Sequence, residues 1–345
     1  MNISEGKLKK IKALSDSNGI ISAAAMDQRG SLLKSIAKEK GVDPKEVSRE
    51  MVEEFKIIVS KTLTPHASAI LLDPEYGLPA AKARSKNAGL LLAYESSGYD
   101  NTRPGRLPDL LEDCSVRRVK AMGADAIKIL IYYSPFDEKR VNEIKHAFVE
   151  RIGSECEDQE IPFFLEFVSY DPKGGDVDSL EFAKRKPEIV AASMEEFAKP
   201  QYQVDVLKVE MPINMKFVEG TKSYKGQKAY SRDEAKAYFK KTAKTSLPFI
   251  YLSAGVGDDE FRESLELAAE SGVTYNGVLC GRATWKNGIP VYAKQGAKAF
   301  ELWMNDQGVK NITALNAVLK KSAKPWYTVY GSEPKACSSK VTAGV

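Results

Sequence analysis

Eight short apolar segments recur along the chain, and segments with helical patterns separate nearly all of them. They lie at residues 20–26, 69–73, 89–95, 124–133, 162–169, 204–212, 248–253 and 277–282. Their hydrophobic runs are continuous rather than alternating, which is typical of parallel strands buried on both faces. Eight strand–helix units in a chain of 345 residues favour a (β/α)8 TIM barrel, an α/β fold, over a doubly wound sheet.

The segments between the predicted strands indicate one domain over residues 1–330, with extra helices at its ends. We expect helices over about 4–16, 44–63, 108–122, 138–156, 259–271 and 290–323, one that ends near 197 and one that begins near 231. Pro44 suits a first helical turn, and Ser231 and Glu234 have the spacing of a capping box. The Pro, Ser, Lys and Gly residues of 331–345 predict a mobile tail.

The composition argues against several functional classes. Hydrophobic residues make up 43% and charged residues 28% of the chain, and the formal net charge of +4 is too small to suggest a nucleic-acid binder. No apolar run approaches the ~18 residues of a membrane span, and the first ten residues are too polar for a secretory signal. The four cysteines lie far apart without a CxxC motif. We therefore expect a cytoplasmic protein with reduced thiols that binds neither nucleic acid nor membranes.

Each predicted strand carries a polar residue at or near its end. These residues are Asp27, Asp73, Glu95, Lys128, Glu166, Lys208, Ser253 and Arg282. In a TIM barrel the carboxyl ends of the strands form the active site, so we expect these side chains to converge there. For Asp73 and Glu95 we favour capping of the following segments or support from behind the site over direct chemistry.

Two lysines and a carboxylate are the strongest catalytic signal in this set. Lys208 lies in the middle of an apolar strand, where a lysine is seldom buried without a partner or a function. If this strand lay at the edge of a sheet, the long side chain could instead extend to water. Lys128 sits at a similar depth in another strand, and Glu166 lies in the strand between them. One structural ion pair would need only one lysine, so the pattern favours catalysis. A neighbouring ammonium would keep the second lysine neutral, able to attack a carbonyl and form a Schiff base while the carboxylate moves protons.

Histidine is scarce in this sequence. Only His66 and His146 are present, and neither lies near another candidate ligand in the sequence. This shortage argues against a histidine-built zinc site and against a Ser-His-Asp triad. We predict an enzyme without a metal and without a cofactor.

Two glycine-containing turns predict a phosphate site. Ser253-Ala254-Gly255 follows the seventh predicted strand, and Gly281-Arg282 follows the eighth. TIM barrels often bind phosphate at these two loops, where small residues let backbone N–H groups approach and an arginine adds a charged fork. Arg29, just after the first strand, could serve a second anionic end of a substrate, or could equally form a surface salt bridge.

At this point the sequence resembles a known family, the tagatose 1,6-bisphosphate aldolases, which are class I (Schiff-base) aldolases. The matching segments are AMDQRG (25–30), LLDPEYG (71–77), GADAIK (123–128), RIGSEC (151–156), VDVLKVE (204–210), YLSAGV (251–256) and VLCGRATW (278–285). They are specific and cover most of residues 20–325. The chain differs from the family pattern in a longer C-terminal tail and in loops at 100–106 and 171–180, which could alter the far end of the substrate.

The resemblance implies a role for each matching residue. It implies a metal-free TIM barrel in which Lys208 forms the Schiff base, Glu166 shuttles protons, and Lys128 and Asp27 support them. The residues that it implies around the phosphate of the ketone half are Gln28, Ser253, Gly255, Gly281 and Arg282. The expected substrate is a phosphorylated ketose, and we expect a homo-oligomer.

Two alternatives remain open at this stage. The first is an aldolase for another anionic ketose phosphate, such as fructose bisphosphate or a 6-sulfo-ketose 1-phosphate, because only contacts at the far end and at C4 would differ. The second is a sugar-phosphate-binding regulator on an inactive aldolase scaffold. The presence of Lys128, Glu166 and Lys208 argues against the regulator.

Overall fold

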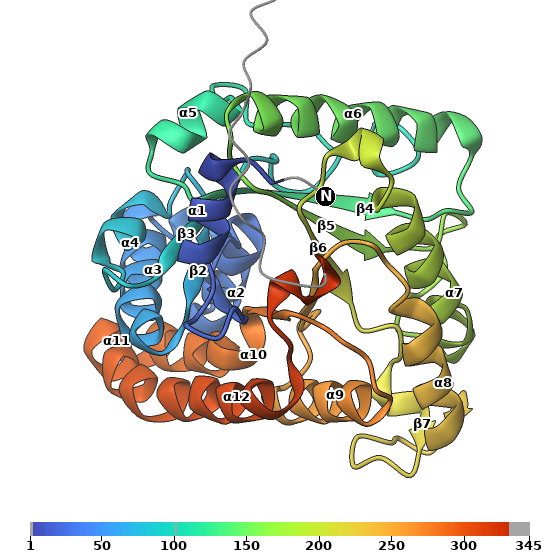
Figure 1. Cartoon of the computed structure of the whole chain (residues 1–345). Helices are drawn as coiled ribbons and strands as arrows, with labels where there is room; N and C mark the ends of the chain where they lie inside the picture. The colour runs from blue at the N-terminus through green and yellow to red at the C-terminus, as the bar shows by residue number, and fades with distance from the viewer. Residues whose placement is uncertain (1–2, 101, 331–345) are drawn as a thin grey trace, which may run out of the picture.

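The protein folds into a closed barrel of eight parallel strands surrounded by helices (Figure 1). This computed structural model describes residues 3–100 and 102–330. The barrel strands are β1 (Ile21–Ala25), β2 (Ala69–Leu72), β3 (Gly89–Ala93), β4 (Ala126–Tyr133), β5 (Phe163–Ser169), β6 (Val206–Glu210), β9 (Phe249–Leu252) and β10 (Gly277–Cys280). Their order around the barrel is β1-β10-β9-β6-β5-β4-β3-β2, with β2 closing on β1. The predicted TIM barrel is confirmed; the predicted tail at 331–345 lies outside the described residues.

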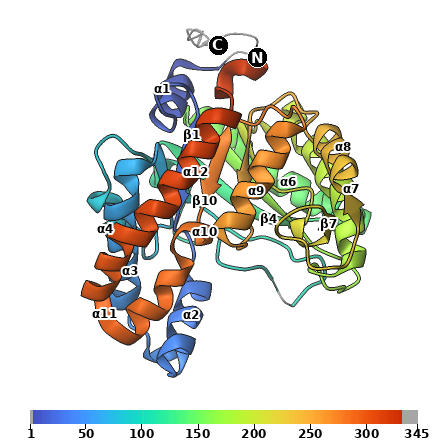
Figure 2. The ribbon, with the colours of Figure 1, turned by 90° about the horizontal axis from the view of Figure 1, so that it is seen from below.

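Helices cover the outside of the barrel. They are α1 (Glu5–Ala13), α2 (Gly30–Lys40), α3 (Arg49–Leu63), α4 (Leu78–Ala83), α5 (Val116–Ala121), α6 (Lys139–Asp158), α7 (Leu180–Phe197), α8 (Arg232–Thr242), α9 (Asp258–Glu270), α10 (Arg282–Trp285), α11 (Ile289–Trp303) and α12 (Val309–Ser322). A two-stranded ribbon, β7 (Val218–Glu219) with β8 (Tyr230–Ser231), lies in the long loop before α8. Figure 2 shows α2 beside α11, although 248 residues lie between the end of α2 (Lys40) and the start of α11 (Ile289).

Several helix boundaries differ from the expectation. The helix α2 was not predicted, because Leu32, Ile36 and Ala37 give only a narrow apolar stripe among lysines. Pro44 begins a separate single turn, and the long helix starts at Arg49. The helix expected over 108–122 was wrong over most of its length, since only Val116–Ala121 is helical.

The helix start that was predicted from a local capping motif agrees with the structure. The Ser231 side chain accepts from the Glu234 backbone N–H, and the Glu234 carboxylate accepts from the Ser231 backbone N–H, so the predicted capping box is confirmed. Each of these contacts satisfies a backbone donor that a helix leaves without an internal partner. Caps depend on residues that are close in sequence, which is why a single sequence predicts them well.

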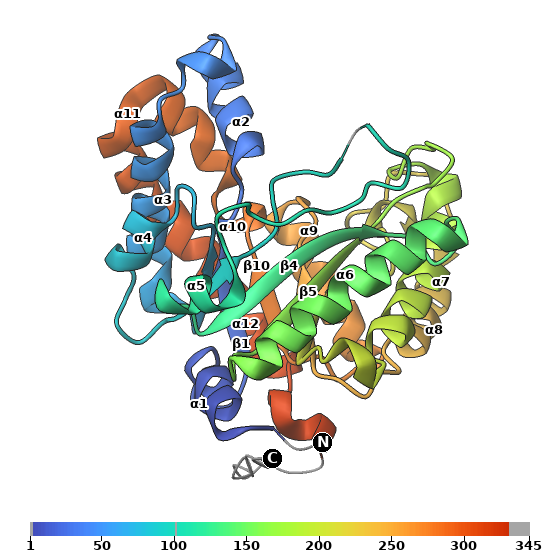
Figure 3. The same ribbon diagram turned by 90° about the horizontal axis from the view of Figure 1, so that it is seen from above.

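The core has two layers, separated by the barrel wall. Alternate residues of each strand point outward, where they pack beneath the helices, as Phe163, Leu165 and Phe167 do. The inward residues form a second cluster with α1 and Trp326, which close one end of the barrel. In Figure 3, α1 lies at that end, and the segment between β3 and α5 arches over the opposite end. Because α1 and Trp326 close the other end, a ligand can enter only at the carboxyl ends of the strands, beneath this segment. Polar side chains can meet the ligand there.

Candidate active site

The register of three neighbouring strands places the predicted lysines and carboxylate in one layer of the barrel interior. In β5 the outward Leu165 and Phe167 flank Glu166, so the Glu166 side chain points inward. Glu166 lies directly opposite Lys208 of β6 in the parallel register. Lys128 of β4 lies two residues before the partner of Glu166, on the same inward face. The alternation that buries the outer faces of these strands therefore also brings the three charged groups together.

Lys128 is the centre of a buried ion cluster. Its Nζ atom lies 2.8 Å from Asp27 Oδ2, 2.8 Å from Glu95 Oε1 and 3.0 Å from Glu166 Oε2. The Lys128 side chain is 0% exposed, and Glu95 and Glu166 are also buried. The ammonium group donates hydrogen bonds to Asp27 and Glu95 and forms an ion pair with Glu166. Lys128 is thus held as a structural cation beneath the site.

The pKa values in this cluster follow from burial and charge. Burial alone would lower the pKa of Lys128, but the carboxylates of Asp27, Glu166 and Glu95 outweigh it and raise the pKa well above its ordinary value. Burial would raise the pKa of Asp27, but the ammonium groups of Lys128 and Lys208 lower it. The pKa of Glu95 is raised, because burial outweighs the attraction of Lys128 and Arg29. Lys128 therefore stays protonated and cannot act as a nucleophile near neutral pH.

Lys208 has a different environment from Lys128. Its Nζ atom lies 2.7 Å from Glu166 Oε2, the same oxygen that contacts Lys128. It forms no other ion pair within 4.0 Å among the residues that the structure describes. Unlike Lys128, Lys208 lines the pocket above the cluster. An amine that faces a cavity, with a carboxylate that bridges it to a fixed cation, can attack a carbonyl there.

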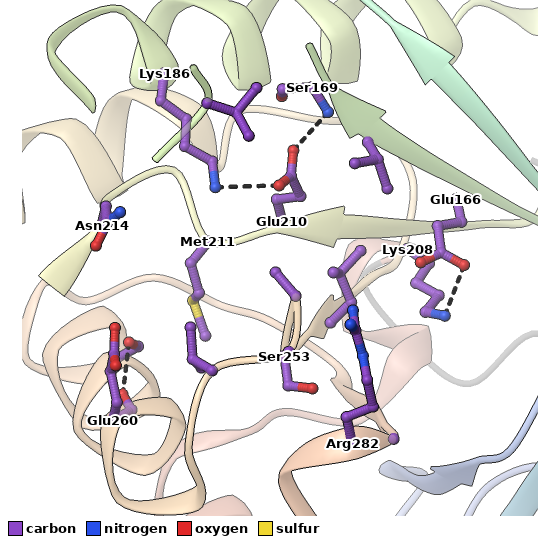
Figure 4. Close-up of a pocket in the computed structure, with 18 of the residues that line it drawn as sticks. Glu166, Ser169, Lys186, Lys208, Glu210, Met211, Asn214, Ser253, Glu260 and Arg282 are labelled. Atoms are coloured by element: carbon purple, nitrogen blue, oxygen red, sulfur yellow. Dashed lines mark hydrogen bonds and ion pairs between the residues drawn. The ribbon is translucent and has the colours of Figure 1, made fainter. Parts of the chain in front are cut away.

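The pocket has a volume of about 360 Å³ and opens at the carboxyl ends of the strands. Figure 4 shows Lys208 of β6 and Arg282, the first residue of α10, pointing into this cavity, with Ser253 beside Arg282. The predicted site residues that line it are Asp27, Gln28, Glu166, Lys208, Ser253, Gly255, Gly281 and Arg282. The structure thus brings together nearly all of the residues that the sequence indicated, while Lys128 lies beneath them.

Small residues and a guanidinium group form one wall of the pocket. A Cβ atom at Gly255 would lie 2.8 Å from Cζ of Arg282, so this glycine is needed for Arg282 to occupy its position. Gly255 also has a φ of 85°, which favours glycine. Lys286 Nζ donates to the Gly255 carbonyl oxygen at 2.7 Å, and Gln28 lies across from Gly281. The wall thus combines the Arg282 guanidinium with approachable backbone, as an anion site requires, and Lys286 supports the turn at Gly255.

A second buried ion pair fixes the segment that carries Asp27 and Gln28. Lys56 of α3 contacts the Asp73 carboxylate, and both side chains are 0% exposed. The Lys56 ammonium also donates to the carbonyl oxygens of Met26 (2.9 Å) and Gln28 (2.7 Å). Asp73 Oδ1 accepts from the Tyr76 backbone N–H, which confirms its expected capping role. Lys56 was missed, because a lysine inside an amphipathic helix gives no sequence signal of burial.

Arg29 differs from both interpretations of its sequence position. It is buried, so it forms no surface salt bridge. It is also not one of the described residues that line the pocket. Its Nη2 atom donates to the Glu95 carbonyl oxygen at 2.7 Å and lies 4.0 Å from Glu95 Oε1. Arg29 therefore supports Glu95, which in turn contacts Lys128.

A side arm of the pocket contains charged residues that the sequence did not indicate. Lys186 Nζ lies 3.1 Å from Glu210 Oε1, and Glu210 Oε2 accepts from the Ser169 backbone N–H (Figure 4). Lys216 and Glu260 also line this arm. Glu210 follows Lys208 with the period of two that places both on the same face of a strand, so this residue could have been predicted.

Comparison with known proteins agrees with this arrangement. Residues 21–287 match the model of the DeoC/LacD family of aldolases. The chain is 53% identical over 333 residues to a tagatose 1,6-diphosphate aldolase of Listeria monocytogenes, which covers 96% of this chain and 97% of that protein. It is 54% identical over 328 residues to tagatose 1,6-diphosphate aldolase 2 of Enterococcus faecalis, with 95% and 97% coverage.

Solved structures share the fold at low sequence identity. A fructose-bisphosphate aldolase from Plasmodium falciparum superposes with a TM-score of 0.68 at 13% identity, covering 94% of this chain and 98% of that one. A Schiff base-forming fructose-1,6-bisphosphate aldolase gives a TM-score of 0.51 at 14% identity, with 86% and 97% coverage. Similarity at this level supports the barrel fold alone. The family model and the relatives above 50% identity go further, and they show that the chain belongs to the DeoC/LacD family of aldolases.

Proposed function

We propose that this enzyme cleaves D-tagatose 1,6-bisphosphate reversibly to dihydroxyacetone phosphate and D-glyceraldehyde 3-phosphate through a Schiff base on Lys208. The observation that carries this proposal is the contrast between two lysines that share one carboxylate oxygen. Lys128 is enclosed by three carboxylates, whereas Lys208 faces the pocket. The relatives above 50% identity carry the name tagatose 1,6-diphosphate aldolase, which supports this choice of substrate.

The reaction begins with attack of the neutral Lys208 amine on the C2 carbonyl carbon of the ketose. Glu166 lies 2.7 Å from Lys208 Nζ and can pass a proton to the departing hydroxyl of the carbinolamine, so that water leaves and an iminium forms. Removal of the C4 hydroxyl proton then breaks the C3–C4 bond. The electron pair of that bond moves into the iminium and gives an enamine, and glyceraldehyde 3-phosphate leaves.

The second half of the reaction regenerates the enzyme. The enamine is protonated at C3, water adds to the resulting iminium, and dihydroxyacetone phosphate is released from Lys208. The iminium acts as the electron sink, so the proposed reaction requires no metal ion. Lys128 orients Glu166 through these steps and is itself held by Asp27, because it contacts both carboxylates.

The phosphate of the ketone half fits the wall formed by Gln28, Ser253, Gly255, Gly281 and Arg282. All five line the pocket, and Arg282 provides a planar cation that can donate two parallel hydrogen bonds to phosphate oxygens. Bound there, the phosphate would hold C2 near the Lys208 amine. Positioning of this kind converts attack by the lysine into an effectively intramolecular step.

Trapping of the covalent intermediate tests the proposal. The protein is incubated with dihydroxyacetone phosphate, reduced with borohydride, and digested for peptide mapping. We expect an adduct on Lys208, none in Lys208→Met, and an undiminished adduct in Lys186→Met, whose lysine also lines the pocket. An adduct on Lys128 with Lys208 unmodified would overturn the assignment.

A substrate panel tests the reaction itself. Aldehyde release is measured with the 1,6-bisphosphates of tagatose and fructose and with a 6-sulfo-ketose 1-phosphate, and tagatose 1,6-bisphosphate is expected to be cleaved. Cleavage of the sulfonated ketose alone would point to a different distal group. Binding without any turnover would identify a sugar-phosphate-binding regulator instead.

A further inference from the structure

The segment between β3 and α5 contains an arginine, Arg106, that lies beside a tyrosine of the pocket wall. Figure 3 shows this segment arching above the strands, and Arg106 lies within it. Its turn is fixed by neighbouring contacts. Gly105 packs so closely on Val141 that a Cβ atom would lie 2.4 Å from Val141 Cγ1, and the Tyr170 hydroxyl donates to the Gly105 carbonyl oxygen at 3.1 Å. The position of Arg106 is therefore determined by α6 and by the residue that follows β5.

The Arg106 guanidinium lies among three tyrosine rings. Its Cζ atom is 5.2 Å from the ring centroid of Tyr99, 5.2 Å from that of Tyr132 and 4.9 Å from that of Tyr170. Within the described part of the chain it has no carboxylate partner closer than 4.0 Å. The aromatic faces hold the cation in place. The N–H donors in the plane of the guanidinium group stay available to a ligand.

The backbone of Arg106 is strained. Its φ angle is 49°, in the left-handed region that a residue with a side chain seldom occupies. Strain of this kind persists where the surrounding structure imposes it, and it often accompanies a functional position. The contacts of Gly105 and the three tyrosines impose it here.

Tyr132 connects this arginine to the active site. It lines the pocket that contains Lys208, and its ring centroid lies 5.2 Å from Arg106 Cζ, although Arg106 itself is not among the lining residues. Burial raises the pKa of Tyr132, and the charges of both Arg106 and Arg282 oppose this rise. Tyr132 therefore lies within reach of the charges of both guanidinium groups.

The other cations of the pocket are less suited to a second anion. Lys186 is paired with Glu210 at 3.1 Å, and the arm that holds Lys216 also contains Glu260 and Asp178. An anion entering that arm would meet carboxylates as well as ammonium groups. Arg29 is buried beneath the site and bonded to Glu95. Arg106 is a cation beside the pocket wall that has no ion pair within 4.0 Å with a carboxylate of the described residues.

We propose that Arg106 binds the distal phosphate of the substrate, the group that leaves on glyceraldehyde 3-phosphate. This inference rests on the proposed function. It gives Arg106 the role at the second anionic end of the substrate for which the sequence suggested Arg29. The Tyr99, Tyr132 and Tyr170 rings orient the guanidinium, and its planar donors match the geometry of phosphate oxygens.

The test uses condensation with dihydroxyacetone phosphate as the fixed ketone. The KM for glyceraldehyde 3-phosphate is compared with the KM for unphosphorylated D-glyceraldehyde in the wild type, Arg106→Gln, Arg106→Lys and Arg106→Gly. Arg103→Gln is the matched control, since Arg103 is exposed on the same segment. We expect Arg106→Gln and Arg106→Gly to raise the KM for the phosphorylated aldehyde roughly tenfold to hundredfold, as loss of a charge-assisted contact predicts.

The KM for D-glyceraldehyde should stay within about twofold of wild type, because an unphosphorylated aldehyde makes no contact of this kind. Arg106→Lys should recover part of the loss. Arg106→Gly accepts the left-handed backbone, so a normal thermal midpoint for this variant excludes misfolding as the cause.

Equal losses for both aldehydes, or an unchanged KM for the phosphorylated one, would overturn the role of Arg106 while the proposed function stands. A wild-type enzyme with no aldolase activity on any ketose phosphate would overturn both. These results are distinguishable, because wild-type cleavage of tagatose 1,6-bisphosphate is measured first.

Discussion

At the scale of single residues, two lysines of the same strand layer have opposite properties. Lys128 is surrounded by Asp27, Glu95 and Glu166, whereas Lys208 shares only Glu166 and faces the pocket. A lysine placed among three carboxylates remains charged, whereas a lysine that faces a cavity can meet a substrate carbonyl. In the proposed mechanism the surroundings of each lysine, rather than the residue type, therefore decide which one is the nucleophile.

Arg282 provides a prediction at this scale. Arg282→Ala removes a charge-assisted, bidentate contact worth on the order of 1.5–3 kcal/mol, which corresponds to roughly a tenfold to hundredfold loss in binding. The loss should appear with dihydroxyacetone phosphate and be much smaller with unphosphorylated dihydroxyacetone, measured as KM in the condensation direction.

The control for this experiment is Arg262→Ala, which removes an arginine that pairs with Asp258 and Asp259 on α9. It should leave both ketones unaffected. Arg282 could instead have a structural role at the barrel rim. In that case the melting temperature would fall and both ketones would lose affinity alike.

At the scale of elements, the segment between β3 and α5 is where the sequence was least informative. A helix was expected over 108–122, but the residues before Val116 form a loop with turns and two isolated antiparallel bridges, Leu110 with Glu95 and Leu107 with Asp100. Pro104-Gly105 and Pro108 indicate turns there but do not say where the turns point. The path of the segment depends on contacts with α6 that lie far away in sequence.

The two glycines of this segment give a second prediction. Gly98 and Gly105 both have left-handed φ angles, of 89° and 92°. A Cβ atom at Gly98 would meet nothing within 4 Å, whereas one at Gly105 would clash with Val141. Gly98→Ala should cost about 1 kcal/mol of unfolding free energy from the backbone alone, and Gly105→Ala about 1–3 kcal/mol more.

Urea unfolding of both variants measures this difference. Adding Val141→Ala to Gly105→Ala should recover part of the loss, because it removes the methyl groups that the new Cβ atom meets. Gly105→Ala should also raise the KM for glyceraldehyde 3-phosphate, since the turn positions Arg106. Equal destabilisation by the two glycine substitutions would show that close packing on α6 does not fix the segment.

At the scale of the whole molecule, the repeated strand–helix pattern was enough to predict the barrel. All eight strands were identified, and so were the residues at their carboxyl ends, because strand alternation and barrel topology determine where those side chains meet. The lateral partners could not be predicted in the same way. Arg29 supports Glu95 and Lys56 holds the carbonyl of Gln28 through long-range packing, which a single sequence does not specify.

We predict that residues 3–330 unfold as one domain that α1 and Trp326 help to close. Trp326 is 1% exposed in the inner core cluster, and its backbone N–H donates to the Gly19 carbonyl oxygen at 2.8 Å. Trp326→Ala should cost on the order of 3–5 kcal/mol, and Tyr327→Ala, at a half-buried position, should cost less.

Tryptophan fluorescence and circular dichroism test this prediction. Trp285 is buried beside the active site, where its Nε1 atom donates to the Ala25 carbonyl oxygen. In Trp326→Ala the fluorescence of the two remaining tryptophans, Trp285 and Trp303, and the circular dichroism should shift to a lower midpoint together. Separate transitions, with only one displaced, would indicate two independent units.

The expected homo-oligomer stays a prediction that light scattering can measure. Among the described residues, no helix is long and apolar enough to cross a membrane.

The closed end of the barrel has a consequence for the path of protons. Beneath Lys128 the interior is filled by apolar side chains of the inner cluster, among them Leu71, Leu91 and Phe164, each 0% exposed. No water-filled route through such packing is expected, so protons held by Glu166 can exchange with solvent only at the pocket mouth. A bound ketone and the segment above it would obstruct that exit. When the enzyme removes a deuteron from a carbon atom of a labelled substrate, we therefore expect part of that deuterium to return to carbon before it exchanges with bulk water.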